Sequence, residues 1–341
     1  MKAAVFRGAG QKLEICDVPM PETGAGQIKL KVKHCGICGS DLHMTDPSAA
    51  HNPAPGAVIG HEFCGEIVEI GAKCDPRWKE GARVTALPFS GCGACAACLS
   101  GEPVWCKQMI SHAGGRIQGG YAEYVVVGAR ETVAMPSALS WREGALIEPL
   151  AVGLHGYNLA NLEPGSDILV LGAGPIGLAV VACARAAGAR HIIVTAKSSQ
   201  RAELARTMGA TDFIESGPEL RKNFAKIAGG PPAAVFECVG APGMIDLCMS
   251  VAPPRSTVVV MGACMQPDTF RPTLGLNKEL RVQYSMAYNV HDFEVAADLI
   301  ARERVAIEPM VTDVVDFAAF PDAFEALRAR TTQCKVLLTP N

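Results

Sequence analysis

The second half of the chain alternates short apolar runs with segments of helical pattern, and this alternation restricts the possible folds more than any other feature. Strands are predicted at the apolar runs 168–171, 191–194, 234–237 and 257–261. Helices are predicted from the glycine-rich turn after the first run to Ala187, and over 202–208. Apolar strands separated by helices indicate a parallel sheet covered on both faces. This half is therefore predicted to be an α/β domain with a doubly wound parallel sheet.

The first 90 residues carry short β-rich runs that Gly and Pro interrupt. The run 27–32 alternates polar and apolar residues, and 65–70 is a second example. Such runs indicate a small barrel or sandwich, whereas residues 91–120 are rich in Cys and Gly and indicate an irregular excursion. The final part of the chain is predicted to contain two helices and a closing strand, around 292–302, 322–329 and 335–338.

The bulk composition excludes several classes of function. The 341 residues suffice for two domains, and 49% hydrophobic against 19% charged residues predicts a large buried core. A net charge of −3, without a basic stripe, argues against a nucleic-acid partner. The N-terminus has no apolar signal region, and no apolar stretch reaches the roughly 18 residues of a membrane span. We therefore expect a cytoplasmic protein without membrane contact.

Four of the 14 cysteines lie close together in the pattern C-x2-C-x2-C-x7-C, at Cys92, Cys95, Cys98 and Cys106. This spacing lets four thiolates converge on one ion, and Zn²⁺ prefers four such ligands in a tetrahedron. A site with four protein ligands has no open position, so a zinc ion here is predicted to be structural. The alternatives are unrelated cysteines or disulfides, which the close spacing and a reducing compartment disfavour.

Upstream of this group, Cys38 and the pair His61-Glu62 offer a thiolate, an imidazole and a carboxylate, all of which can bind zinc. Three protein ligands leave a position for water or substrate, and an alcohol bound there would lose its proton more easily. Each residue also has a structural interpretation, Cys38 as a core thiol and His61 as a loop histidine. Local spacing does not show that Cys38 and His61 meet.

A glycine-rich turn with the sequence Gly172-Ala173-Gly174-Pro175-Ile176-Gly177 follows the predicted strand 168–171 and opens a helix. This strand–turn–helix context is typical of dinucleotide-binding sites. The glycines permit a tight turn and a close approach of the backbone, and the helix N-terminus favours a pyrophosphate.

About 20 residues after this turn, an NAD site carries an acidic residue that binds the adenosine ribose. Here the run is Thr195-Ala196-Lys197-Ser198-Ser199-Gln200-Arg201, which contains no acid. Because a small residue with cations nearby accommodates a 2′-phosphate, Ala196, Lys197, Ser198 and Arg201 predict NADP(H) over NAD(H). The alternative is that Lys197 and Arg201 only solvate the start of a helix.

Taken in order, these motifs resemble those of the zinc-containing medium-chain dehydrogenases over essentially the whole chain. The matching segments are Cys38–His43, Gly60-His61-Glu62, the four cysteines and the glycine-rich turn. The segment 147–155 is similar to the polyol (sorbitol-type) branch of the family. The resemblance implies a GroES-like β-barrel catalytic domain over 1–150 and 287–341, with a structural zinc lobe at about 90–110. It also implies a Rossmann cofactor domain over 151–286.

The resemblance further assigns roles to individual residues. It implies that Cys38, His61, Glu62 and Glu148 surround a catalytic zinc, with Glu62 reaching it directly or through water, while Cys35 has a structural role. Ser40 matches the position that contacts the substrate oxygen, and His43 matches the position that passes its proton to solvent; a surface histidine is the alternative for His43. On the cofactor side, the matching positions are Cys238, Val239 and Gly262, with a buried thiol as the alternative for Cys238.

The leading hypothesis is a zinc-dependent dehydrogenase of secondary alcohols or polyols that uses NADP(H) and holds two zinc ions per chain. Its partners would be a small alcohol or ketone and further copies of the chain, because the family forms dimers and tetramers, often through the edge strand of the cofactor domain. A zinc-free quinone or enone reductase on the same fold would lack Cys38, His61 and the four cysteines. A zinc-knuckle protein that binds nucleic acid is opposed by the acidic balance and the cofactor turn.

Overall fold

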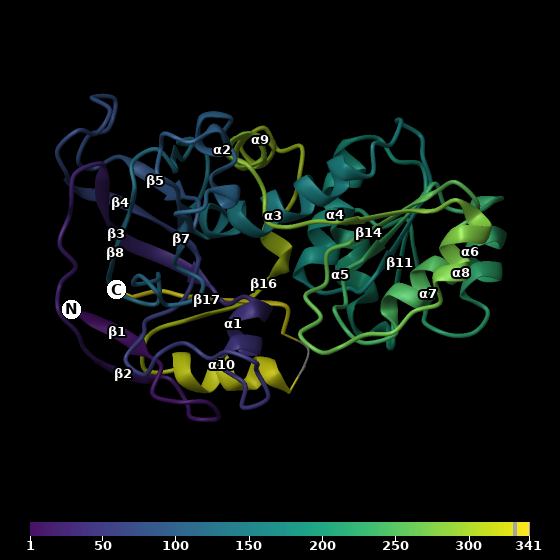
Figure 1. Cartoon of the computed structure of the whole chain (residues 1–341), viewed down its shortest axis with the longest axis horizontal. Coiled ribbons are helices and arrows are strands. Elements are labelled where there is room, and N and C mark those ends of the chain that lie inside the picture. Colours follow the sequence, from purple (N-terminus) through teal and green to yellow (C-terminus); the bar gives the residue numbers. More distant parts are fainter. Residues whose placement is uncertain (330–332, 341) are drawn as a thin grey trace. The chain divides into compact units, whose positions relative to one another are not determined.

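The computed structural model describes residues 1–329 and 333–340, and the chain divides into two compact units (Figure 1). The first unit comprises 1–148, 288–301 and 311–341, and the second comprises 149–287 and 302–310. The segment 302–310 thus clusters with the second unit, whereas the division expected from sequence placed it in the first.

The first unit is built on a seven-stranded sheet in which β8 and β17 both pair with the long strand β3. Every pairing is antiparallel except that of β16 with β17. The strand order is β16-β17-β3-β4-β5-β9. Their bounds are β3 (Gln27–Gly36), β4 (Glu62–Ile70), β5 (Arg83–Ala86), β8 (Tyr124–Gly128), β9 (Thr132–Ala134), β16 (Val311–Val315) and β17 (Lys335–Leu338).

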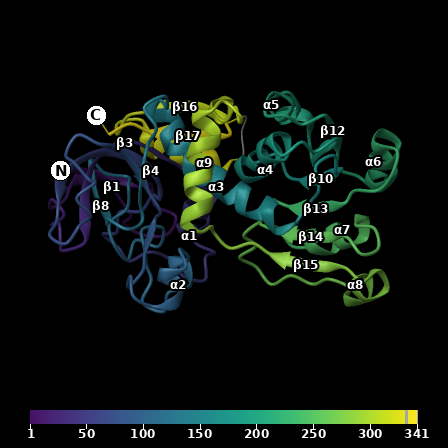
Figure 2. The same cartoon turned by 90° about the horizontal axis from the view of Figure 1, so that it is seen from above.

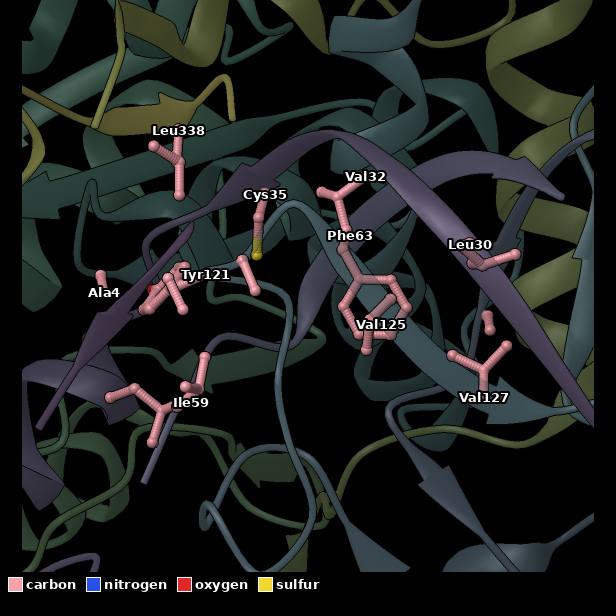
Figure 3. Packing of buried hydrophobic residues seen from close by; sticks show 14 of the residues in the cluster. Ala4, Leu30, Val32, Cys35, Ile59, Phe63, Tyr121, Val125, Val127 and Leu338 are labelled. Atoms are coloured by element: carbon pink, nitrogen blue, oxygen red, sulfur yellow. The ribbon is translucent and has the colours of Figure 1, made fainter. Parts of the chain in front are cut away.

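Buried apolar side chains from these strands and from neighbouring loops form the core of the first unit. Figure 3 shows Val32, Cys35, Phe63 and Tyr121 of this core pointing into the space between the strands. Alternation along β3 sends Ile28, Leu30 and Val32 inward, as the pattern of 27–32 predicted.

Short elements complete the first unit. Two small antiparallel pairs are β1 (Lys2–Val5) with β2 (Glu14–Asp17), and β6 (Phe89–Ser90) with β7 (Ile110–Ser111). The helices are α1 (Gly39–Met44), α2 (Ala96–Leu99), η1 (Pro103–Trp105), α9 (Val290–Ala301) and α10 (Phe320–Arg328).

Helix α3 (Trp141–Leu159) runs from the first unit into the second. It begins with a capping box, in which Glu143 accepts hydrogen bonds from the backbone and hydroxyl of Ser140, and the Ser140 hydroxyl accepts one from the Glu143 N–H. At 19 residues it is a long helix, yet none of the helices in the described part of the chain is both long and apolar enough to cross a membrane.

The second unit contains a six-stranded parallel sheet with the order β12-β11-β10-β13-β14-β15. This order is that of a doubly wound sheet, the fold class predicted from sequence. Every residue of β10, β13 and β14 is buried, so both faces of the sheet are covered there. Figure 2 shows β13, β14 and β15 following one another toward one edge. The strands are β10 (Ile168–Leu171), β11 (Ile192–Ala196), β12 (Asp212–Glu215), β13 (Ala234–Glu237), β14 (Thr257–Val260) and β15 (Arg281–Tyr284).

Helices connect these strands. Their bounds are α4 (Pro175–Ala186), η2 (Ser199–Arg201), α5 (Ala202–Thr207), α6 (Leu220–Ala228), α7 (Met244–Val251), α8 (Pro272–Lys278) and η3 (Glu308–Met310). The sequence patterns located α4 and α5 but not β12 and β15, the two edge strands. Edge strands are partly exposed, so they lack the continuous apolar run that marks a buried strand.

Candidate functional site

Three predicted ligands converge at one end of the sheet of the first unit. Strand β3 ends at Gly36, which lies opposite Glu62 at the start of β4, so the segment after β3 and the segment before β4 meet. Cys38 caps α1 there, and His61 immediately precedes β4. One potential ligand atom from each of Cys38, His61 and Glu62 lies within 4.8 Å of the others. The structure therefore brings together residues that local spacing left apart.

The chemistry of this set suits a divalent cation. His61 and Glu62 are buried, and sulfur, nitrogen and oxygen donors face one another. Burial would lower the pKa of His61, but the nearby charges of Asp41 and Cys38 raise it well above its ordinary value. A buried group of sulfur, nitrogen and oxygen ligand atoms, surrounded by negatively charged side chains, fits a bound zinc ion.

Asp41 and Tyr121 support His61, and neither was singled out from the sequence. Asp41 is fully buried on α1, and its Oδ1 lies 3.2 Å from Nδ1 of His61. Its Oδ2 accepts hydrogen bonds from the hydroxyl of Tyr121 at 2.5 Å and from the backbone N–H of Cys38 at 3.1 Å. A carboxylate on the far nitrogen fixes the ring orientation of a metal-binding histidine. The signal that could have revealed Asp41 is its position three residues after Cys38, on the first turn of α1.

Glu62 is held by a lysine from the far end of the sequence. Nζ of Lys335, on β17, lies 2.6 Å from both carboxylate oxygens of Glu62 and donates to the carbonyl of Ile37 at 2.9 Å. Both side chains are 1% exposed. Burial would lower the pKa of Lys335, but the charges of Glu62 and Cys38 raise it. The ammonium therefore competes with a metal ion for the oxygens of Glu62.

Glu148 lies near this set but outside the group whose ligand atoms converge within 4.8 Å. It is buried on α3, and its Oε1 accepts a hydrogen bond from the hydroxyl of Tyr288 at 2.9 Å. Burial is the main cause that raises the pKa of Glu148 to about 7, and the charge of Glu62 adds to it. Tyr288 was not predicted, because a tyrosine 140 residues away carries no local signal.

The predicted proton-path residues lie on α1, directly after Cys38. Ser40 is half-buried near the start of the helix, and His43 is exposed one turn later. Residues three apart on a helix share a face. Cys35, by contrast, is buried in the apolar core of the first unit (Figure 3), and burial raises the pKa of its thiol.

The four cysteines of the irregular segment also meet. One sulfur atom from each of Cys92, Cys95, Cys98 and Cys106 lies within 4.8 Å of the others. Backbone N–H groups of Ala94 and Cys95 lower the pKa of the Cys92 thiol to about 6, which favours the thiolate that zinc binds. All 14 cysteines are free thiols.

Two residues from the turn between β8 and β9 hold the loop that carries the four cysteines. Arg130 donates to the carbonyl of Gly93, and the buried carboxylate of Glu131 accepts from the N–H of Gly91 at 3.2 Å. Sequence analysis did not identify either residue.

In the second unit, the glycine-rich turn joins β10 to α4. Gly172 has a φ of +108°, and a Cβ there would lie 3.0 Å from the carbonyl oxygen of Cys238. A Cβ on Gly177 would lie 2.0 Å from the carbonyl oxygen of Gly172, so that position requires glycine for a tight turn. Gly174 caps α4, with Pro175 and Ile176 following at its start, and this helix N-terminus is suited to a pyrophosphate.

The predicted residues Cys238 and Val239 lie close to this turn, and Gly262 packs against the segment 237–240. The buried carboxylate of Glu237 accepts hydrogen bonds from the N–H groups of Val239 and Gly240, at 2.8 and 2.9 Å. A Cβ on Gly262 would lie 2.1 Å from the backbone nitrogen of Gly240. Glu237 therefore organises the backbone of this segment, a role that the sequence pattern did not reveal.

The run 195–201, which lacks an acidic residue, begins in the last two residues of β11 and continues past the strand. Ala196 ends this strand, and Lys197 and Ser198 are exposed after it. Arg201 donates from Nη1 to the carbonyl of Ala173 at 3.1 Å, so its guanidinium lies against the glycine-rich turn. The register of the sheet places Glu215 of β12 opposite Ala196.

Known proteins share this architecture. An alcohol dehydrogenase GroES-like domain matches residues 24–137, and a zinc-binding dehydrogenase domain matches residues 175–302. Galactitol 1-phosphate 5-dehydrogenase of Escherichia coli K12 is 30% identical over 326 residues, which cover 92% of each chain.

Two solved structures are similar over almost the whole chain. A putative zinc-binding dehydrogenase from Sinorhizobium meliloti 1021, bound to NADP, has a TM-score of 0.90 and 32% identity and covers 99% of both chains. An alcohol dehydrogenase (rspB) from E. coli CFT073, complexed with NADH, has a TM-score of 0.90 and 30% identity and covers 100% of this chain and 99% of that one. These matches confirm the predicted fold class, a GroES-like domain joined to a Rossmann domain.

Proposed function

The chain belongs to the zinc-containing medium-chain alcohol dehydrogenases, and on this premise we propose that it oxidises a secondary hydroxyl of a polyol or diol, or reduces the matching ketone, with NADP(H). Enzymes of this family transfer a hydride between an alcohol carbon and a nicotinamide cofactor. The observation that carries the proposal is the convergence of Cys38, His61 and Glu62 within 4.8 Å. Four-cysteine sites alone cannot perform this chemistry, because they leave no position for a substrate.

In this proposal, the first unit holds the catalytic zinc and the second unit holds the cofactor. Cys38, His61 and Glu62 would bind the zinc, with Glu148 beside them. When bound, zinc supplies a Lewis acid that lowers the pKa of the substrate hydroxyl, and the nicotinamide ring supplies the hydride acceptor. Asp41 holds the ring of His61 in place, and Lys335 holds Glu62.

The chain itself supplies the path for the released proton. The hydroxyl of Ser40 accepts the proton of the substrate and passes its own toward His43. His43 is exposed, so its ring can exchange that proton with solvent. Replacing Ser40 with Ala should lower kcat, because the hydroxyl proton then has no acceptor on the path, while Ser48→Ala on the exposed loop should leave kcat unchanged.

The preference for NADP(H) is supported by the run after β11. With the cofactor bound, Ala196 would leave space beside the adenosine ribose, and Lys197 and Arg201 would provide positive charge for a 2′-phosphate. The carboxylate of Glu215 argues against a 2′-phosphate site, because Glu215 of β12 pairs with Ala196 of β11. Arg201→Ala should raise the KM for NADP about tenfold while changing the KM for NAD little, if it loses one charged hydrogen bond to phosphate. Arg206→Ala, on the exposed side of α5, is the matched control, and equal effects on both cofactors would refute the assignment.

Two zinc ions per chain are proposed, the second held by Cys92, Cys95, Cys98 and Cys106. Fourteen free thiols suit a reducing compartment such as the cytoplasm. Metal analysis of the purified protein tests this count: about two zinc ions per chain are expected, and about one would leave only one of the two sites occupied.

We also propose that the chain forms dimers or tetramers through the edge strand β15. Within the described residues, β15 pairs with β14 on one side and with no strand on the other. Large apolar side chains around it are exposed, Leu276 by 77%, Tyr284 by 58% and Met286 by 58%. An open edge with an apolar surround is a surface that a second copy can cover. Sedimentation analysis of Tyr284→Lys should show a shift toward monomer, and an unchanged assembly would refute this use of the edge.

The direct test of the enzymatic proposal is a panel of polyols, linear secondary alcohols and aromatic alcohols, assayed with NADP and with NAD. Oxidation of a polyol or diol with NADP supports the proposal. Activity restricted to quinones or enones, insensitive to zinc chelation, would refute it.

A further inference from the structure

Helix α1 carries Cys38 at its N-terminal cap and Ser40 and His43 along its length, yet it has only six residues. Isolated helices shorter than about 12 residues are marginal in water, so contacts with the rest of the chain must hold α1 in shape. Asp41 fixes its N-terminal end, where it accepts a hydrogen bond from the N–H of Cys38 at 3.1 Å. The orientation of His43 depends on the other end, because this residue lies in the last turn.

The last carbonyl groups of α1 are hydrogen-bonded, and one of their donors comes from the far end of the chain. A helix leaves its last four carbonyl groups without partners of its own. Residues that directly follow the helix supply donors for three of them: Thr45 for Asp41, Asp46 for His43 and Asn52 for Met44. The carbonyl of Leu42 accepts a hydrogen bond from Nη1 of Arg328 at 2.5 Å, and these two residues are 286 positions apart.

Arg328 is itself fixed by contacts at the end of α10, which packs against α1 (Figure 1). Its Nη2 donates to the hydroxyl of Thr45 at 2.6 Å, and this buried hydroxyl donates to the carbonyl of Asp41 at 2.7 Å. Its Nε donates to Glu325 at 2.9 Å, and its guanidinium carbon lies 5.4 Å from the centroid of the Phe324 ring. One planar group therefore joins α10 to both the backbone and a side chain at the end of α1.

The charge and the shape of Arg328 suit this position. A helix C-terminus carries a partial negative charge, which a nearby cation stabilises. The guanidinium donates in fixed directions, so it can bridge the two acceptors on Leu42 and Thr45 in one geometry. The side chain of Arg328 is 22% exposed, so water screens these contacts only in part.

We propose that Arg328 is a positioning residue for the dehydrogenase reaction, which caps α1 and so keeps His43 aligned with Ser40 for proton transfer. This inference rests on the proposed function, because it takes the path through Ser40 and His43 from there. Arg328 acts through the carbonyl of Leu42 and the hydroxyl of Thr45, not through the substrate or the cofactor. Proton transfer requires donor and acceptor within hydrogen-bond reach, and a displacement of about 1 Å can lower a rate roughly a hundredfold.

The test replaces Arg328 with Met, which keeps much of the length of the side chain but removes its donors and its charge. We expect kcat for alcohol oxidation to fall about tenfold, while the KM values for the alcohol and the cofactor change little, because the binding of neither depends on the last turn of α1. The zinc content should stay that of the wild type. The solvent deuterium isotope effect on kcat should increase, because proton transfer becomes slower. Arg328→Lys keeps the charge and should recover part of kcat.

A double-variant cycle shows whether Arg328 acts through His43. His43→Ala removes the end of the proton path, so adding Arg328→Met to it should lower kcat less than about twofold further. A second loss of about tenfold in the double variant would overturn the inference, because the two residues would then act independently. If His43→Ala alone leaves kcat unchanged, the proton path is wrong and the inference falls with it, whereas zinc-dependent hydride transfer stands.

Hydrogen–deuterium exchange tests the cap without reference to catalysis. The amides of residues 42–46 should exchange faster in Arg328→Met than in the wild type, because the last turn of α1 opens more often. Unchanged exchange over these residues would show that Arg328 does not hold α1, and would overturn the inference. A wild-type protein that oxidises no alcohol would refute the proposed function, whereas the exchange of residues 42–46 would still decide whether Arg328 caps the helix.

The matched control is Lys278→Met, because Lys278 on α8 caps the C-terminal end of α7 in a similar way. Its Nζ donates at 2.8 Å to three carbonyl oxygens, those of Met249, Ser250 and Ala252. The control should speed amide exchange at the end of α7 and leave kcat and its solvent isotope effect unchanged. An equal fall of kcat in Lys278→Met would show that the loss of any such cap lowers activity, and would overturn the specific role of Arg328.

Discussion

The two candidate metal sites of the first unit are assembled in different ways. Cys92, Cys95, Cys98 and Cys106 come from one short segment, and Cys92 reaches the surface. Cys38, His61 and Glu62 come from two segments, and a network of buried groups around them includes Asp41, Tyr121 and Lys335. The first group takes all four of its ligands from that one segment. The second would leave a position open, and it depends on residues from four separate parts of the chain, around positions 38–41, 61–62, 121 and 335.

The comparison predicts that catalysis is most sensitive at Cys38. In Cys38→Ser, kcat/KM should fall about 10³-fold or more, because the Lewis acid that is worth several kcal/mol is lost or misplaced. Zinc content should fall by about one ion per chain, with the four-cysteine zinc retained. Cys35→Ser, three residues upstream in the apolar core, is the control and should keep both zinc ions. Full activity in Cys38→Ser would remove this residue from the catalytic site.

The second prediction concerns the buried pair Lys335–Glu62. In the zinc-free protein, Lys335→Met should lower the free energy of unfolding by about 3 kcal/mol, because Glu62 then keeps a buried charge without a partner. Denaturant unfolding measures this change. The double variant Lys335→Met with Glu62→Gln should recover much of the loss.

The exposed pair Lys12–Asp322, at 64% and 77% exposure, provides the control for that experiment. Lys12→Met should leave the free energy of unfolding almost unchanged, because water screens an exposed ion pair. Equal losses of unfolding free energy in Lys335→Met and Lys12→Met would show that burial does not increase the contribution of the Lys335–Glu62 pair to stability.

A smaller effect is expected at Tyr121. Tyr121→Phe removes only the hydroxyl that bonds to Asp41, so the ring of His61 is less firmly oriented. The rate at which a chelator removes the catalytic zinc should rise about tenfold, and kcat/KM measured with saturating zinc should fall less. Tyr157→Phe, on the buried α3 segment of the second unit, should not change zinc release. An unchanged rate of zinc removal in Tyr121→Phe would show that the hydrogen bond between Tyr121 and Asp41 does not help to hold the metal.

The smallest effect on catalysis is expected at the four-cysteine group. In Cys95→Ser, the melting temperature should drop, because a structural zinc contributes folding energy. The kcat/KM of the molecules that remain folded should stay within about threefold of the wild type, since no substrate position lies at this group. Calorimetry with active-site titration separates the two quantities. A catalytic loss as large as that of Cys38→Ser would abolish the distinction between the sites.

The sequence by itself determined the elements with strong periodic patterns and the groups with short spacing. The apolar strands β10, β11, β13 and β14 were predicted close to their observed bounds, and the helices α9 and α10 begin two residues earlier than expected. The four cysteines and the glycine-rich turn were also evident, because every member of each group lies within a few residues of the next. These features depend on local backbone geometry, which local sequence encodes.

Only the tertiary structure decided which distant residues share the open site. Glu62 and Lys335 are 273 residues apart, yet they touch because β17 pairs with β3 and β3 pairs with β4. Tyr288 reaches Glu148 across 140 residues, and Tyr121 reaches Asp41 across 80. Strand pairing depends on hydrogen bonds and packing between segments that are remote in the chain, and no residue spacing records such contacts. The closed cysteine site could therefore be recognised from spacing alone, whereas the supporting shell of the open site became visible only in the folded molecule.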